Sequence, residues 1–174
     1  MPRSRIHQME RVLGFAARFL EEVRDDLSRG KMDGTDTPPR LRCVHERPGH
    51  ASPEFRTLSI PVPDALGGVS PEILSGVIAR YGATKKPDCL MLAFEAETQE
   101  HGPVLVAEAR CRYGTRMFWV QPYRVEPSHV EWGDPLDGGW RDPGDEEMIL
   151  DAAFNAIPAR PAVMAVAVPR AAAV

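Results

Sequence analysis

The stretch DCLMLAFEAETQEHGPVLVAEARCRYGTRMFWVQPYRVE, residues 88–126, decides the fold of this 174-residue chain. It holds three runs of strand-forming residues, each bounded by turn-forming residues: Cys89–Glu97, Val104–Tyr113 and Met117–Glu126. Short polar segments that contain Gly102 or Gly114 connect neighbouring runs. The pattern predicts a three-stranded antiparallel meander.

The second connection sets the expected register of this meander. Gly114-Thr115 suits a two-residue type II′ turn, because glycine accepts a positive φ without a Cβ clash. Such a turn places Cys111 opposite Phe118 and Ala109 opposite Val120. The three strands then share one apolar face, made by Leu90, Leu92, Phe94, Ala96, Leu105, Ala107, Ala109, Cys111, Phe118 and Val120.

The opposite face of the expected meander mixes charged, apolar and aromatic residues. The same register places Arg110 opposite Trp119, as a cation–π pair, and Val106 opposite Tyr123. One interpretation is a solvated face with cross-strand ion pairs, and another is a binding surface for a partner or a ligand. The candidate binding residues are Glu95, Glu108, Arg110, Trp119, Tyr123, Trp132 and Trp140.

Length and composition limit the classes of function. Residues 1–158 are expected to form a single domain with a core of its own, followed by a Pro/Ala/Val-rich tail, residues 159–174, that is an edge strand or disordered. The net charge of −4 and the pI of about 5.7 disfavour nucleic acids and anionic membranes as partners. Three cysteines without framework spacing favour reduced thiols and a cytoplasmic location. We expect neither a signal peptide nor a membrane span, since the longest apolar run, residues 162–168, is too short.

The N-terminal segment predicts a long amphipathic helix. Ser4 suits its N-cap and Gly30 its end. The helix is interpreted either as packing on its own sheet or as the seam of a homodimer, with Phe15 and Phe19 at the seam. Its apolar residues recur at alternating intervals of three and four: Ile6, Met9, Leu13, Ala16, Leu20, Val23 and Leu27.

Four further elements complete the expected fold. Leu41–Glu46 and Phe55–Val62 are candidate strands, and Asp145–Ile157 is a candidate short helix. Another helix is expected to begin with Ser70 as its N-cap and Pro71 as its first helical residue, and to end at Gly82. The order α-β-β-α-β-β-β-α predicts an α+β domain with an antiparallel sheet, whose apolar face is covered by the first two helices.

Motifs that carry chemistry are sparse in this sequence. Cys43, His45 and His50 are candidate metal ligands, but their spacing matches no zinc pattern. The acidic segment 133–147 lacks the ligand spacing of a calcium loop and is expected to be a structured loop pinned by its tryptophans. The sequence also has no phosphate-binding loop, dinucleotide-binding glycine motif, nucleophile elbow or zinc-protease motif. We therefore expect no catalytic residue, metal or cofactor.

Two functions from different classes are consistent with an α+β domain that has no recognisable catalytic motif. The first is a non-enzymatic interaction or assembly module that acts as a homodimer or binds another protein. The alternative is a small-molecule binder or an enzyme, with a site on the polar face of the meander under the Trp132–Trp140 loop. Glu95 and Glu108 would supply acid–base groups to such an enzyme, although strand carboxylates beside arginines are usually ion-paired.

Overall fold

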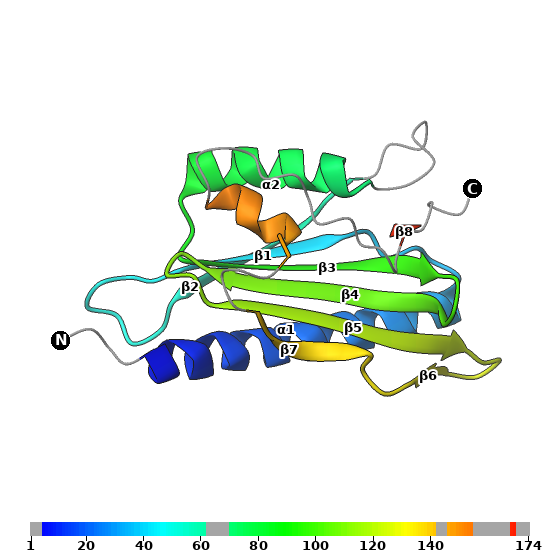
Figure 1. The fold of residues 1–174 in the computed structure, drawn as a ribbon. Coiled ribbons are helices and arrows are strands. Elements are labelled where there is room, and N and C mark those ends of the chain that lie inside the picture. The colour runs from blue at the N-terminus through cyan, green and yellow to red at the C-terminus, as the bar shows by residue number, and fades with distance from the viewer. Residues whose placement is uncertain (1–4, 62–69, 142–145, 155–167, 170–174) are drawn as a thin grey trace.

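An antiparallel sheet with helices against both of its faces makes up the computed structural model (Figure 1). The structure describes residues 5–61, 70–141, 146–154 and 168–169, with only the backbone of residues 5–7 and 168–169. Helix α1 (Arg5–Asp33) lies on one face, and α2 (Pro71–Lys85) and the short 3₁₀ helix η2 (Ile149–Ala153) lie on the other. The α+β class is confirmed, with the two long helices on opposite faces rather than together on one apolar face.

The expected meander is the centre of the sheet, and strands from both ends of the chain extend it. The meander consists of β3 (Cys89–Thr98), β4 (Gly102–Cys111) and β5 (Arg116–Val125). The strands that extend it are β1 (Arg40–His45), β2 (Glu54–Ser59), β6 (Val130–Trp132), β7 (Asp137–Arg141) and β8 (Val168–Pro169). Their order is β2-β1-β3-β4-β5-β6, with β7 also pairing with β5 and β8 with β3.

The turn between β4 and β5 differs from the expected one. The Cys111 N–H donates to the Thr115 carbonyl at 3.0 Å, and the Gly114 N–H donates to the Cys111 carbonyl at 3.1 Å. The loop therefore has three residues, 112–114, and its last residue, Gly114, has a positive φ of 94°. The expected pairs with Phe118 and Val120 are therefore wrong: the actual pairs are Ala109 with Met117, Glu108 with Phe118 and Arg110 with Arg116.

The sheet is apolar on both faces. Leu92 pairs with Glu108 and Ala93 with Ala107, so Leu92 and Ala107 face opposite sides. The face under α1 buries Val44, Cys89, Met91, Ala93, Leu105, Ala107, Ala109, Cys111, Met117 and Tyr123. The face under α2 and η2 buries Leu41, Cys43, Leu90, Leu92, Phe94, Ala96, Val104, Val106 and Val120. The single continuous apolar face that we expected is wrong, because near-continuous apolar strands are buried on two sides.

Helix α1 uses its apolar stripe against its own sheet. Phe19 and Leu27 are 1% and 0% exposed, which matches the first of the two interpretations of this stripe. The helix runs past Gly30 to Asp33, where the Thr35 N–H donates back to the Gly30 carbonyl at 2.8 Å and Gly34 has a φ of 69°. This Schellman motif explains the later end. Ser4, the expected N-cap, lies outside the described residues.

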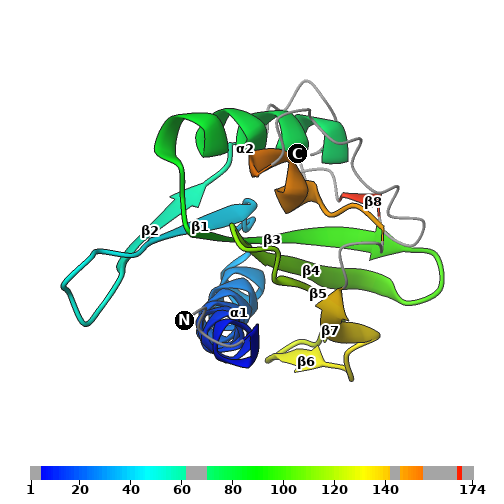
Figure 2. The same cartoon turned by 60° about the vertical axis from the view of Figure 1, so that its left-hand side comes forward.

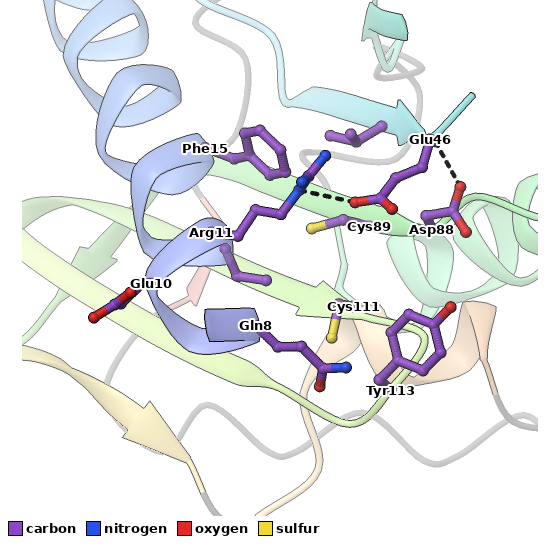
Figure 3. Close-up of a pocket in the computed structure, with 11 residues that line it drawn as sticks. Gln8, Glu10, Arg11, Phe15, Glu46, Asp88, Cys89, Cys111 and Tyr113 are labelled. Atoms are coloured by element: carbon purple, nitrogen blue, oxygen red, sulfur yellow. Dashed lines mark hydrogen bonds and ion pairs between the residues drawn. The ribbon is translucent and has the colours of Figure 1, made fainter. Parts of the chain in front are cut away.

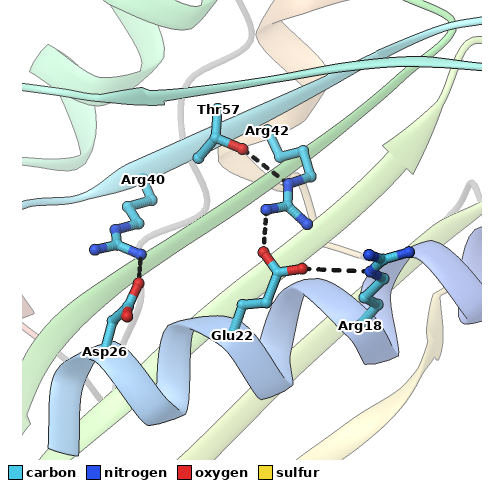
Figure 4. A network of polar contacts seen from close by, with 6 residues as sticks. All are labelled: Arg18, Glu22, Asp26, Arg40, Arg42 and Thr57. Carbon is cyan, nitrogen blue, oxygen red and sulfur yellow. Dashed lines mark hydrogen bonds and ion pairs between the residues drawn. The ribbon is translucent and has the colours of Figure 1, made fainter. Parts of the chain in front are cut away.

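Ion pairs also tie α1 to β1 (Figure 4). Asp26 pairs with Arg40, and Glu22 pairs with Arg42 of the same strand. The Arg42 Nε–H also donates to the Thr57 hydroxyl of β2 at 2.9 Å, so one network links the helix to the β1–β2 hairpin. The Arg42 guanidinium holds the pKa of Glu22 below its usual value, since it donates to the carboxylate.

Helix α2 begins as expected and ends later. The Ser70 hydroxyl accepts the Ile73 N–H at 3.2 Å, and Pro71 is the first helical residue. Gly82 does not end the helix, which continues to Lys85 and stops at Lys86 in the left-handed region, with a φ of 47°. Gly82 instead lies against η2, where a Cβ would clash with Ala153.

The remaining expectations are met in part. The strand expected at Phe55–Val62 ends at Ser59, and the helix expected at Asp145–Ile157 is reduced to η2 within the described residues. The loop between Trp132 and Trp140 contributes β7 to the sheet. The tail lies outside the described residues except for β8. None of the helices in the described ranges combines the length and the apolar character that crossing a membrane requires.

Candidate functional site

The seven candidate binding residues do not form one surface. Glu95, Trp119, Tyr123, Trp132 and Trp140 lie on the α1 side of the sheet, where the four aromatic residues join the core. Glu108 and Arg110 lie on the other side, under η2. The expected common face is wrong because both β3 and β5 pair with β4 in registers other than the expected ones: Glu95 pairs with Leu105, and Ala109 pairs with Met117. Glu95 and Glu108 are therefore separated by the sheet and do not form an acid–base pair. The binding role of these residues stays a prediction.

The candidate residues near the end of β5 attach the C-terminal half of α1 to the sheet. The Tyr123 hydroxyl donates to the Glu95 carboxylate, which also pairs with Lys31 of α1 at 2.7 Å. The Trp132 indole N–H donates to the Ser28 hydroxyl at 3.1 Å, and the Arg24 guanidinium lies 5.0 Å from the Trp132 ring. These contacts account for the aromatic and charged side chains through packing within the chain.

Trp119 of β5 and Trp140 of β7 lie on the α1 side of the sheet, where these two strands pair. The Trp119 indole N–H donates to the Gln121 side-chain oxygen at 3.4 Å, and its ring lies against the backbone of Gly138 in β7. Trp140 pairs with Met117 across β7 and β5. The arrangement confirms a structured segment between the two tryptophans at positions 132 and 140.

Glu108 and Arg110 belong to a buried cluster that holds η2 on the sheet. The Glu108 carboxylate accepts the N–H groups of Ile149 and Leu150 at 3.1 and 2.9 Å. Burial raises the pKa of Glu108 to about 7, partly opposed by these two hydrogen bonds. Asp151 of η2 pairs with Arg110 at 2.7 Å and with Arg116 at 2.8 Å. The cluster thus has a structural explanation.

The three candidate metal ligands are not gathered into a site. Cys43 Sγ lies 3.5 Å from His45 Nδ1, and His45 Nε2 lies 2.9 Å from the Lys85 carbonyl oxygen. Burial raises the pKa of the Cys43 thiol. No group of three or more His, Cys, Asp or Glu side chains suited to a metal occurs in the part of the chain that the structure describes.

A cavity of about 1030 Å³ lies between the N-terminal half of α1 and the ends of β1, β3 and β4 (Figure 3). Its floor is formed by the partly buried Phe15 and by four buried residues, two valines and two cysteines: Val12, Val44, Cys89 and Cys111. Its mouth is lined by Gln8, Glu10, Arg11, Glu46, Asp88 and Tyr113. We define these eleven residues as the α1 cavity.

Ion pairs and hydrogen bonds hold the mouth of the α1 cavity in place. Arg11 of α1 reaches across to Glu46, after β1, with 2.8 Å between Nε and Oε1 (Figure 3). The Glu46 backbone N–H donates to the Asp88 carboxylate at 2.7 Å, and Asp88 also pairs with Arg112 at 2.8 Å. Tyr113, in the loop after β4, is 66% exposed and stands at the rim.

A second depression of about 570 Å³ adjoins the α1 cavity and shares Glu10, Arg11 and Phe15 with it. It lies between α1 and the β1–β2 hairpin, which projects from the edge of the sheet in Figure 2. Phe15 makes an edge-to-face contact with Phe55 of β2, with ring centroids 5.4 Å apart. Both depressions therefore lie along one side of the first half of α1.

Sequence reasoning missed the α1 cavity because its residues come from four separate segments. The only signal lay in Cys89 and Cys111, which were both expected inside strands, but their meeting depends on the register. No protein-family model, curated protein or solved structure is significantly similar to this chain. The geometry of the described residues is therefore the basis for a functional proposal.

Proposed function

We propose that this chain binds a small organic ligand in the α1 cavity. The observation that carries the proposal is the cavity itself, about 1030 Å³ with an apolar floor and an ordered polar mouth. Small-molecule sites are typically concavities of about 300–1,000 Å³ with a mostly apolar lining and a few fixed polar groups. The proposed ligand site lies under α1, away from the polar strand face that the sequence indicated.

The lining favours a ligand with an apolar body and an uncharged or cationic polar end. Val12, Phe15 and Val44 offer apolar surface at the floor, where burial of the ligand is favourable. Three carboxylates and one guanidinium line the mouth, so its charge is net negative and disfavours anions. Arg11, Glu46 and Asp88 of the mouth are held by contacts with one another, which supports binding rather than acid–base catalysis.

A titration with Nile red, an uncharged apolar dye, tests this proposal. Val12→Trp fills the floor of the cavity and is expected to weaken dye binding at least tenfold, while wild type gives saturable binding. Leu13→Trp is the matched control, since it places the same side chain on the neighbouring position, which is 47% exposed. Circular dichroism checks that both variants fold. Equal dye affinity for Val12→Trp and wild type would refute the cavity as the site.

A second candidate function is self-association through β2, and a specific feature of this strand favours it. β2 pairs only with β1 in the described chain, and its Phe55 and Leu58 are 43% and 40% exposed. An open edge of this kind is a template for another strand. Antiparallel pairing of two copies around Phe55 would place each Glu54 opposite Arg56 of the other copy, which joins opposite charges.

This homodimer differs from the one expected at Phe15 and Phe19, because Phe19 is buried in its own chain. Arg56→Glu is expected to abolish a dimer that wild type forms, as measured by sedimentation equilibrium, because it places two carboxylates opposite each other. Arg80→Glu, on the exposed side of α2, is the charge-matched control. A monomeric wild type at concentrations near 100 μM would exclude this candidate.

We also propose that neither nucleic acids nor membranes are partners and that the protein works in the cytoplasm. The net charge of −4 supports the first point, because polyanions favour basic surfaces. The second is supported by the three cysteines, which are all free thiols. Partial proteolysis of intact cells with and without permeabilisation tests the location.

A further inference from the structure

Two cysteines from neighbouring strands lie side by side at the floor of the α1 cavity. Cys89 of β3 and Cys111 of β4 are direct partners across the two strands. Both belong to the core under α1 and both line the cavity. Figure 3 shows their sulfur atoms on the α1 side of the sheet, beneath the first turns of the helix.

The hydrogen-bond pattern places these cysteines at a position where the strands are closest. The Arg112 N–H donates to the Asp88 carbonyl at 2.9 Å, which is the bond that flanks a non-hydrogen-bonded pair. The Cys111 N–H points the other way, to Thr115 of the β4–β5 turn. Cα atoms of a non-hydrogen-bonded pair are about 4.5 Å apart, and disulfides span Cα separations of about 4.4–6.8 Å. The backbone position of this pair therefore falls within the range of Cα separations that a disulfide can bridge.

The third cysteine is excluded from this pair by the sheet. Val44, not Cys43, is the partner of Cys89 across β1 and β3. Cys43 pairs with Leu90 and is buried in the core under α2. Its sulfur therefore lies on the opposite face from the α1 cavity.

We propose that Cys89 and Cys111 form a redox-active dithiol that closes into a cross-strand disulfide by exchange with a small uncharged disulfide entering the α1 cavity. The cavity supplies the route, because both thiols are otherwise almost fully buried. The uncharged oxidant follows from the acidic mouth, which disfavours anionic disulfides. The exchange uses the α1 cavity as its entrance but requires no bound ligand there.

The exchange proceeds in two balanced steps. The Cys111 thiol loses its proton, and its thiolate attacks one sulfur of RSSR, forming Cys111–S–S–R and releasing the first RS⁻, which takes up a proton to give RSH. The Cys89 thiol then loses its proton and attacks the Cys111 sulfur, which breaks the mixed disulfide and releases the second RSH. Two protein thiols are oxidised, and one RSSR is reduced to two RSH.

Cys111 is assigned the first attack for two reasons. It is slightly more exposed than Cys89, at 5% against 3%. Burial, reinforced by the neighbouring Cys111, raises the pKa of the Cys89 thiol well above its usual range, so its thiolate is scarce. Cys89 therefore acts as the resolving thiol.

Exchange with bis(2-hydroxyethyl) disulfide on the folded chain tests the proposal. After incubation the protein is denatured, its remaining thiols are blocked with N-ethylmaleimide, and its intact mass is measured. Wild type is expected to lose two hydrogens and to take up one blocking group, and Cys43→Ala is expected to take up none. Three blocking groups on wild type, a bridge that includes Cys43, or a bridge between molecules would overturn the proposal.

Two alanine variants test the order of the steps. Alanine is chosen because both positions are buried, and circular dichroism checks that the variants fold. Cys89→Ala is expected to trap the mixed disulfide on Cys111, whereas Cys111→Ala leaves Cys89 as a free thiol. A mixed disulfide on Cys89 instead would overturn the assigned order. The exchange assay contains no dye. A failure of Nile red binding and a failure of disulfide exchange are therefore detected independently.

Discussion

Gly82 of α2 lies so close to Ala153 of η2 that a Cβ on Gly82 would stand 2.5 Å from the Ala153 carbonyl oxygen. The two helices pack on the same face of the sheet, and this glycine sets the distance between them. A glycine inside a helix is normally unfavourable by about 1 kcal/mol relative to alanine. Its presence here is explained by the close approach of the η2 backbone, which leaves no room for a methyl group.

Gly82→Ala is therefore expected to destabilise the chain, by about 1–3 kcal/mol, despite the higher helix propensity of alanine. Gly76→Ala in the same helix is the matched control, because its Cβ would meet no atom within 4 Å. This control is expected to be neutral or stabilising by up to about 1 kcal/mol. Urea denaturation measures both. Equal free energies of unfolding for the two variants would contradict the packing argument.

Glu108 makes the stability of the chain depend on pH. Its pKa is raised from 4.5 to about 7 in the folded state, mainly because it is buried. The folded state therefore binds more protons than the unfolded state between these values, so the free energy of unfolding falls as pH rises from about 4.5 to about 7. The contribution of this one group is up to about 3 kcal/mol.

Glu108→Gln is expected to remove this part of the pH dependence. The amide cannot titrate, and it keeps one oxygen to accept an N–H from the start of η2. Urea denaturation at several pH values between 5 and 8 measures the slope for wild type and variant. Glu131→Gln, at an exposed position of β6, is the control and should keep the wild-type slope. An unchanged slope in Glu108→Gln would show that another group causes the dependence.

Much of the fold was predictable because its signals are local. The alternating spacing of apolar residues predicted α1, and Ser70-Pro71 predicted the start of α2. The three runs between Cys89 and Glu126 predicted the central meander. Each of these elements depends on residues that are neighbours in the chain.

The register and the site were not predictable because they depend on distant residues. Gly114 suits both a two-residue and a three-residue turn, and the actual turn shifts the pairing by an odd number of residues. Such a shift turns one strand over relative to its neighbour. Glu95 and Glu108 were placed on one face because the register of β3 with β4, in which Glu95 lies opposite Leu105, was not predictable either. The α1 cavity also requires the position of the helix, which no local pattern contains.

Tyr123 is expected to contribute to stability through its hydroxyl group. The hydroxyl donates to the partly buried Glu95 carboxylate, which also pairs with Lys31 of α1. Tyr123→Phe leaves this carboxylate with one donor fewer and is expected to cost about 1–3 kcal/mol. Thermal denaturation followed by circular dichroism measures the loss. Tyr113→Phe, at a residue 66% exposed, removes the same hydroxyl group and should have almost no effect. Similar melting temperatures for the two variants would remove the structural role assigned to Tyr123.

Closing the Cys89–Cys111 disulfide is expected to stabilise the chain without changing its fold. The two cysteines are direct partners in adjacent strands, so the bond links positions that are already close in the folded state. It restricts the unfolded chain between residues 89 and 111, and loops of this length correspond to about 3 kcal/mol in the chain-entropy model. Strain in the native state would lower this value. Guanidinium denaturation of Cys43→Ala in its oxidised and reduced forms measures the difference free of the third thiol. An oxidised form that unfolds at a lower guanidinium concentration would show that the strands must distort to form the bond, which contradicts the geometry on which the dithiol was assigned.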